Sequence, residues 1–133
     1  MKVCIVSGSF PPQPCGVGDY AERLALELSA SGHVVEVVAT KPGTSPVHPL
    51  VQYQVEKWTL RAWIQAVGWI LIRQYDIIHF QYPARFYGYS PMLAFLTLVL
   101  RLKSRHVPIV VTIHEFRISH ALRRLTVAAI TLP

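Results

Sequence analysis

Short runs of aliphatic residues recur along the chain, each of a length that suits a buried strand better than a helix. They are Val3–Ser7, Val34–Ala39, Asp76–Phe80 and Ile109–Thr112. Strands that are buried on both faces of a parallel sheet have this nearly continuous apolar pattern. A fifth segment, Val51–Val55, alternates apolar with polar residues, which predicts a half-exposed edge strand.

Helical patterns occupy the stretches between these runs. In the first of them Tyr20, Leu24 and Leu28 recur every four residues and place an apolar stripe on one helix face. Capping residues predict the limits of the helices. The predicted helices run from about Asp19 to Gly32, from Thr59 to about Gln74, from Ser90 and Pro91 to before Pro108, and onward from about Ser119.

The alternation of strands with helices predicts an α/β fold: a Rossmann-like, mainly parallel sheet with helices on both faces. The 133 residues are enough for one domain with a real core, so we expect a single domain over residues 1–133. Apolar residues make up 52% of the chain and charged residues 15%, which excludes a disordered chain.

The longest apolar run, Met92–Leu100, is about half the roughly 20 residues that span a bilayer. The run at Val3–Ser7 is too brief for a signal sequence. The two cysteines, Cys4 and Cys15, have neither the number nor the spacing of a disulfide framework or a metal site. We therefore expect free thiols, no metal and a cytoplasmic protein.

The net charge of +6 comes from 13 Lys and Arg against 7 Asp and Glu. The basic residues gather late in the chain, at Arg101, Lys103, Arg105, His106, Arg117, Arg123 and Arg124. Such a patch can meet an anionic membrane or a phosphorylated ligand, or it can simply be a solvated helix face. No sequence signature of a nucleic-acid-binding module accompanies it, so a nucleic-acid partner is not expected.

Three segments follow strands and therefore belong at the carboxyl edge of the sheet, where folds of this class bind ligands. They are Ser9–Tyr20, Gln81–Tyr89 and His114–Arg117. All three are rich in glycine, aromatic or ionisable residues. The edge that they share is the predicted site.

Gly16 and Gly18 fit the loose dinucleotide pattern G-x-G-x-x-A, but a proline-containing loop separates them from the strand. The second strand also has its only acid, Glu36, in its interior, so NAD binding is disfavoured. Bare N–H groups of Gly16, Val17 and Gly18 at a helix start still suit a phosphate. The alternative is that both glycines only shape a turn, with Asp19 as the helix N-cap.

His114 directly follows a buried strand and is well placed for proton transfer or for gripping a sugar hydroxyl, although a structural role is the alternative. His79 lies within a strand and is expected to be a hydrogen-bonded core residue. The aromatic rings of the second segment can stack on a sugar face or simply pack. They are Tyr82, Phe86, Tyr87 and Tyr89.

Three motifs, in order and at fitting distances, resemble the N-terminal domain of retaining, GT-B-fold glycosyltransferases of the large group 4 family. They are Ser9–Pro12 with Gly16–Tyr20, Tyr75–Tyr82, and Val111–Phe116. The resemblance implies two Rossmann-like domains facing a cleft, with the acceptor bound mainly by the N-terminal domain and the nucleotide-sugar by the C-terminal one. It also implies chemistry without a metal or a cofactor, since the nucleotide-sugar is a co-substrate.

By the same resemblance, the segment Gly16, Val17 and Gly18 approaches the donor phosphates, and His114 sits near the transferred sugar as the catalytic residue. The residues expected on the acceptor side are Asp19, Tyr20, Tyr82 and Glu115. The acceptor is expected to be a sugar or a lipid-linked sugar, with peripheral membrane contact through the basic helices.

The family's donor-domain motif, with its paired glutamates, is missing from this sequence, which ends on the apolar stretch Ile130–Pro133. We therefore expect a truncated domain that lacks the donor-binding half and is inactive alone. A non-catalytic ligand- or partner-binding module is the alternative, and a nucleotide-binding oxidoreductase domain is a remote one.

Overall fold

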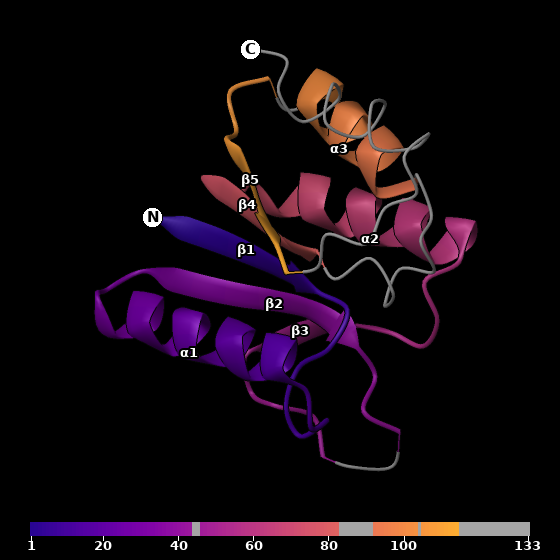
Figure 1. Cartoon of the computed structure of the whole chain (residues 1–133). Coiled ribbons are helices and arrows are strands. Elements are labelled where there is room, and N and C mark those ends of the chain that lie inside the picture. The colour runs from indigo at the N-terminus through magenta and orange to yellow at the C-terminus, as the bar shows by residue number, and fades with distance from the viewer. Residues whose placement is uncertain (44–45, 83–91, 104, 115–133) are drawn as a thin grey trace.

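The computed structural model shows a five-stranded parallel sheet covered by helices on both faces (Figure 1), as the sequence predicts. It describes residues 1–43, 46–82, 92–103 and 105–114. The described elements are β1 (Lys2–Ser7), α1 (Gly16–Ala30), β2 (Val34–Thr40), β3 (Val51–Val55), α2 (Leu60–Arg73), β4 (Ile77–Tyr82), α3 (Met92–Lys103) and β5 (Ile109–Ile113).

The strands are ordered β3-β2-β1-β4-β5, so successive strands are added first on one side of β1 and then on the other. The chain first moves outward from β1 through β2 to β3, then crosses back over the sheet to β4 and continues to β5. In Figure 1, α1 lies on one face of the sheet, while α2 and α3 lie on the other. The helices that follow β1 and β4 along the chain, α1 and α3, therefore cover opposite faces, and folds of this class bind ligands at the carboxyl ends of such strands.

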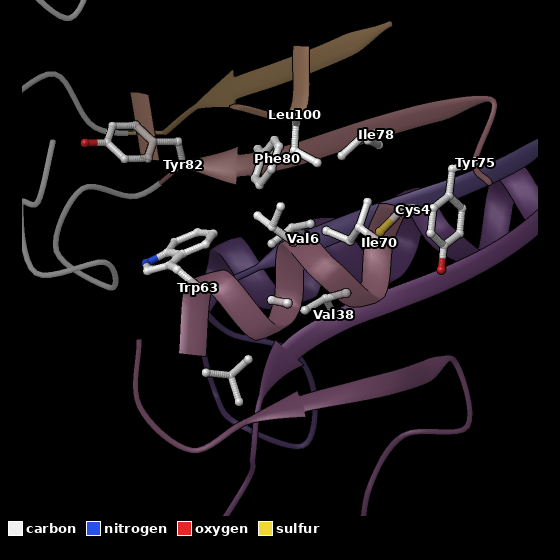
Figure 2. Close-up of a cluster of buried hydrophobic side chains, with 13 residues drawn as sticks. Cys4, Val6, Val38, Trp63, Ile70, Tyr75, Ile78, Phe80, Tyr82 and Leu100 are labelled. Atoms are coloured by element: carbon white, nitrogen blue, oxygen red, sulfur yellow. The ribbon is translucent and has the colours of Figure 1, made fainter. Parts of the chain in front are cut away.

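Two apolar clusters hold the helices on the sheet. On one face, Trp63 and Ile70 of α2 pack on strand residues such as Phe80, together with Leu100 of α3 (Figure 2). On the other face, small residues of α1 such as Ala25 lie against Ile5 and its neighbours. The alternation of side chains along each strand divides the sheet between these clusters.

Several predicted boundaries are confirmed. Val51–Val55 is a strand at the edge of the sheet. The hydroxyl of Thr59 caps α2 by accepting a hydrogen bond from the N–H of Ala62 at 3.2 Å. Gly32 follows α1 with a φ of 82°, a left-handed conformation that glycine adopts without strain. The predicted helix start at Ser90 and Pro91 and the last predicted helix lie outside the described residues.

Two boundaries differ from the prediction. α1 begins at Gly16 rather than near Asp19, and its N-cap is Cys15, so the alternative in which Asp19 caps the helix is wrong. β4 continues past Phe80 to Tyr82, because β5 offers pairing partners at Thr112 and Ile113. The last two residues of β4 thus belong to the sheet rather than to a loop.

None of the helices in the described ranges is long and apolar enough to cross a membrane. Cys4 is a free, fully buried thiol of the core, and its burial raises its pKa. Cys15, the other free thiol, is partly exposed at the start of α1.

Candidate functional site

The carboxyl ends of β1, β4 and β5 lie side by side, and the strand register brings their last residues together. Ser7 is opposite Gln81, and Gln81 is opposite Thr112. The loop after β1, the end of β4 and the residue after β5 therefore meet at one edge, as predicted. His114 lies at this edge, and its N–H donates to the carbonyl of Tyr82 at 3.1 Å.

The loop between β1 and α1 is braced by hydrogen bonds at its base. The Ser7 hydroxyl donates to the carbonyl of Ser9 at 2.5 Å, and the Thr40 hydroxyl donates to the carbonyl of Gly8 at 2.7 Å. Phe10 is buried in the cluster under α1. These contacts fix the direction from which the chain enters the helix.

The start of α1 presents backbone N–H groups. The first helical hydrogen bond runs from the N–H of Asp19 to the carbonyl of Cys15 at 2.9 Å. The N–H groups of Gly16, Val17 and Gly18 precede it and lie outside the helical ladder, at the positive end of the helix dipole. This arrangement suits an anion such as a phosphate.

The two glycines of this helix start differ in their surroundings. A Cβ on Gly18 would lie 3.1 Å from the Ser9 hydroxyl oxygen and 3.3 Å from the backbone of Phe10, so Gly18 allows close packing of the loop on the helix. A Cβ on Gly16 would meet nothing within 4 Å, and Gly16 is exposed. Neither has a positive φ. The alternative of turn-forming glycines therefore does not hold, because both lie in the helix.

His114 is held between the sheet and α1. Its Nε2 lies 2.7 Å from Oε1 of Gln81. Its ring packs edge-on against Tyr20, with ring centroids 5.3 Å apart, and Tyr20 is about half exposed. Two residues that are far apart in the sequence and were both predicted for the site thus touch each other.

Gln81 connects His114 to His79, which was predicted to be a hydrogen-bonded core residue rather than part of the site. The Gln81 side chain is fully buried, and its Nε2 lies 3.3 Å from Nε2 of His79. The same His79 nitrogen lies 2.8 Å from the hydroxyl of Thr112. Burial lowers the pKa of His79, and the neighbouring His114 lowers it further. Gln81, the first residue of the second predicted segment, had been assigned no role, and Thr112 was missed, because the significance of both depends on strand register.

The other predicted residues are more scattered. Asp19 is exposed in the first turn of α1. The ring of Tyr82 is buried in the cluster beneath α2 and α3, at the end opposite Tyr75 (Figure 2), and burial raises its pKa. A contact between Tyr82 and an acceptor stays a prediction. Glu115, Phe86, Tyr87, Tyr89 and Arg117 lie outside the described residues.

Glu36 does not reach the ligand edge. It pairs with Lys2 at 3.5 Å and Arg73 at 3.3 Å, and it accepts a hydrogen bond from Tyr75, the residue two before β4. A ribose-binding acid would instead close the second strand. Within the described ranges, no three residues among His, Cys, Asp and Glu form a cluster that could hold a metal ion.

The lowered pKa of His79 predicts a pH dependence of stability. A histidine whose pKa falls on folding stabilises the protein above the ordinary pKa of 6.5, and that stability is lost as the pH falls through 6.5 toward the folded pKa. We expect the free energy of unfolding to fall less steeply over this range in His79→Gln than in the wild type. Urea melts at about pH 7.5 and about pH 5.5 measure this difference. Equal losses of unfolding free energy in the wild type and in His79→Gln would contradict a lowered pKa of His79.

A parallel sheet of this strand order, with helices on both faces, a helix start and a histidine at its carboxyl edge, defines an open, Rossmann-like α/β domain. The sequence profile described as Glycosyltransferase Family 4 matches residues 14–130. The chain belongs to this family. Membership favours the glycosyltransferase interpretation over the oxidoreductase alternative.

Two solved structures are similar in fold. One is an alpha-glucosyltransferase in complex with UDP and a 13-mer DNA containing a central A:G mismatch, with a TM-score of 0.60 and 18% identity over 97% of this chain. The other is an alpha-glucosyltransferase in complex with UDP, with a TM-score of 0.59 and 20% identity over 97% of this chain. The chain spans 35% and 33% of their lengths. No curated protein sequence matches.

Proposed function

We propose that this chain is the acceptor-side domain of a glycosyltransferase that moves a sugar from a nucleotide-sugar to an acceptor. The observation that carries the proposal is the meeting of the α1 start, Tyr20 and His114 at one sheet edge in a family 4 fold. A second, donor-binding domain supplies the other side of the cleft. The UDP bound by both similar structures supports a nucleotide-sugar donor.

In this proposal the chain's own groups stabilise charge and orient the sugar. The N–H groups of Gly16, Val17 and Gly18 face the donor phosphates, where negative charge grows as the sugar–phosphate bond breaks. His114 contacts the transferred sugar, and Asp19 and Tyr20 line the acceptor side. Neither a metal nor a cofactor is part of the proposed chemistry.

The proposed acceptor is a sugar or a lipid-linked sugar. One similar structure holds DNA, which raises nucleic acid as another class. Proteins bind nucleic-acid phosphates with several Lys and Arg side chains. Tyr20 and Gln81, which contact His114 at this edge, are uncharged. Among the described residues, Lys41, whose carbonyl accepts a hydrogen bond from Gln13 of the β1–α1 loop, adds a single cation near this edge. The edge therefore favours a sugar acceptor.

The helices on the other face suit a membrane surface. The sequences of α2 and α3 contain no acidic residue. Exposed apolar side chains include Leu60, Ile64, Ile72, Leu98 and Leu102. Arg101 and Lys103 lie in the last turn of α3, close in sequence to the exposed Leu98 and Leu102. Cations beside exposed apolar side chains attract an anionic bilayer, and this fits a lipid-linked acceptor.

Vesicle binding tests the membrane contact. We expect Arg101→Ala to weaken binding to vesicles that contain phosphatidylglycerol roughly fivefold, since a cation near the surface contributes about 1 kcal/mol. Arg23→Ala on α1, which covers the opposite face, is the matched control and should bind as the wild type does. Equal losses in both variants, or equal binding to vesicles of phosphatidylcholine alone, would overturn this part of the proposal.

The proposed function is tested by transfer itself. The protein assayed joins this chain to a donor-binding domain and is incubated with a panel of nucleotide-sugars and sugar acceptors. Formation of a glycosylated product, detected by its mass, supports an enzyme. The alternative of a non-catalytic binding module predicts ligand binding without product.

A further inference from the structure

The amide of Gln81 has a carbonyl oxygen that can only accept hydrogen bonds and an NH2 group that can only donate them. The oxygen lies 2.7 Å from Nε2 of His114, and the nitrogen lies 3.3 Å from Nε2 of His79. With the amide in this orientation, His114 carries a hydrogen on Nε2 and donates it to Oε1 of Gln81. His79 must offer a lone pair at its own Nε2, so a neutral His79 carries its hydrogen on Nδ1.

The Thr112 hydroxyl is compatible with the same assignment. It lies 2.8 Å from Nε2 of His79 and can donate to that lone pair. If His79 were doubly protonated, its Nε2–H would face the NH2 group of Gln81, which also can only donate. Burial, which lowers the pKa of His79, also favours the neutral ring. Burial thus favours a neutral His79, and the orientation of the Gln81 amide selects its tautomer, with which the Thr112 hydroxyl is compatible.

We propose that Gln81 is a positioning residue that fixes the tautomer and the ring orientation of His114, so that neutral His114 has its acceptor nitrogen at Nδ1. A substrate hydroxyl would then donate to His114, whereas His114 would not serve as a proton donor. The part that concerns substrate rests on the proposed function. The part that concerns the tautomers stands on the hydrogen-bond geometry of this chain.

Gln81 is well suited to this task because its own position is fixed. It lies in β4 between Ser7 of β1 and Thr112 of β5, and its side chain is fully buried. The ring of Tyr20 contacts His114 edge-on. A buried glutamine that makes hydrogen bonds in a rigid strand holds its partner more precisely than a loop residue would.

Imidazole 1H–15N spectra of the 133-residue chain, at about pH 8.5 where histidines are neutral, report the tautomers directly. We expect His79 as the Nδ1–H form and His114 as the Nε2–H form in the wild type. In Gln81→Glu both carboxylate oxygens accept, so His79 should switch to Nε2–H while His114 stays unchanged. In the exposed control Gln54→Glu neither ring should change. A wild-type His79 with its hydrogen on Nε2, or a His79 that is unaffected by Gln81→Glu, would overturn the proposal.

Activity separates this inference from the proposed function. In the protein with a donor-binding domain, we expect Gln81→Leu to lower kcat on the order of tenfold at nearly constant KM, and Gln81→Glu to recover part of the loss. Unchanged kcat in Gln81→Leu with altered tautomers would refute the positioning role. The absence of transfer in the wild type, with the expected spectra, would refute the proposed function while leaving the tautomer assignment in place.

Discussion

Replacing His114 with alanine, in a protein that joins this chain to a donor-binding domain, is expected to lower kcat about a hundredfold. In a retaining transfer, positive charge develops on the sugar, so a group that accepts a hydrogen bond from a hydroxyl of that sugar helps most in the transition state. Loss of one such contact typically costs about 3 kcal/mol. The fold should survive, because His114 is only partly buried at the edge of the sheet.

Thermal melts and steady-state kinetics on the same preparation separate this role from a structural one. The hydrogen bond to Gln81 at 2.7 Å is lost in the variant, so a modest fall in melting temperature is expected as well. His106→Ala, at an exposed position, is the control and should keep the wild-type kcat. A His114→Ala enzyme with wild-type kcat and a lowered melting temperature would reduce the histidine to a structural residue.

Gly16→Val is expected to lower activity, whereas Gly18→Val is expected to lower stability. At Gly16 the side chain enters open space, so the protein should stay folded while a donor phosphate is pushed away from the helix N–H groups. We expect kcat/KM to fall about a hundredfold in the two-domain protein. At Gly18 the side chain meets Ser9 and the Phe10 backbone, and overpacking of this kind costs about 1–3 kcal/mol of stability.

The comparison requires the loss of kcat/KM and the shift in melting temperature for both variants. Gly18→Val serves as the structural reference for Gly16→Val, because both positions lie in the first turn of α1, two residues apart. If Gly16→Val unfolds as readily as Gly18→Val, the phosphate role of Gly16 loses its support. Wild-type kcat/KM in a folded Gly16→Val protein would remove it from the site.

The architecture could be predicted because it depends on local patterns. The apolar runs at β1, β2, β4 and β5, the alternation at β3 and the cap at Thr59 each indicate an element within a few residues. The convergence of His114 with the α1 start also followed, since the ends of parallel strands share an edge. The fold class and the edge at which these segments meet could therefore be predicted without knowledge of side-chain contacts.

The hydrogen bonds among the side chains of the candidate site could not be predicted, because they depend on the register between β4 and β5. Gln81 appeared to begin a loop, and only the pairing of β4 with β5 places it beside Thr112 and His114. Asp19 had the side chain of an N-cap, yet the helix starts three residues earlier at Gly16. At Gly18 the loop packs closely on this first turn, a tertiary contact without a local sequence signal.

We expect this edge of the sheet to act in sugar transfer only as one side of a cleft, with a donor-binding domain on the other side. The most direct measurement is product formation from a nucleotide-sugar panel, followed by mass, with the 133-residue chain alone and with the chain joined to a donor-binding domain. Because transfer needs both sides of the cleft around one transition state, we predict no turnover by the chain alone and turnover by the two-domain protein. Turnover by the chain alone, or none by the two-domain protein with any donor, would contradict the account.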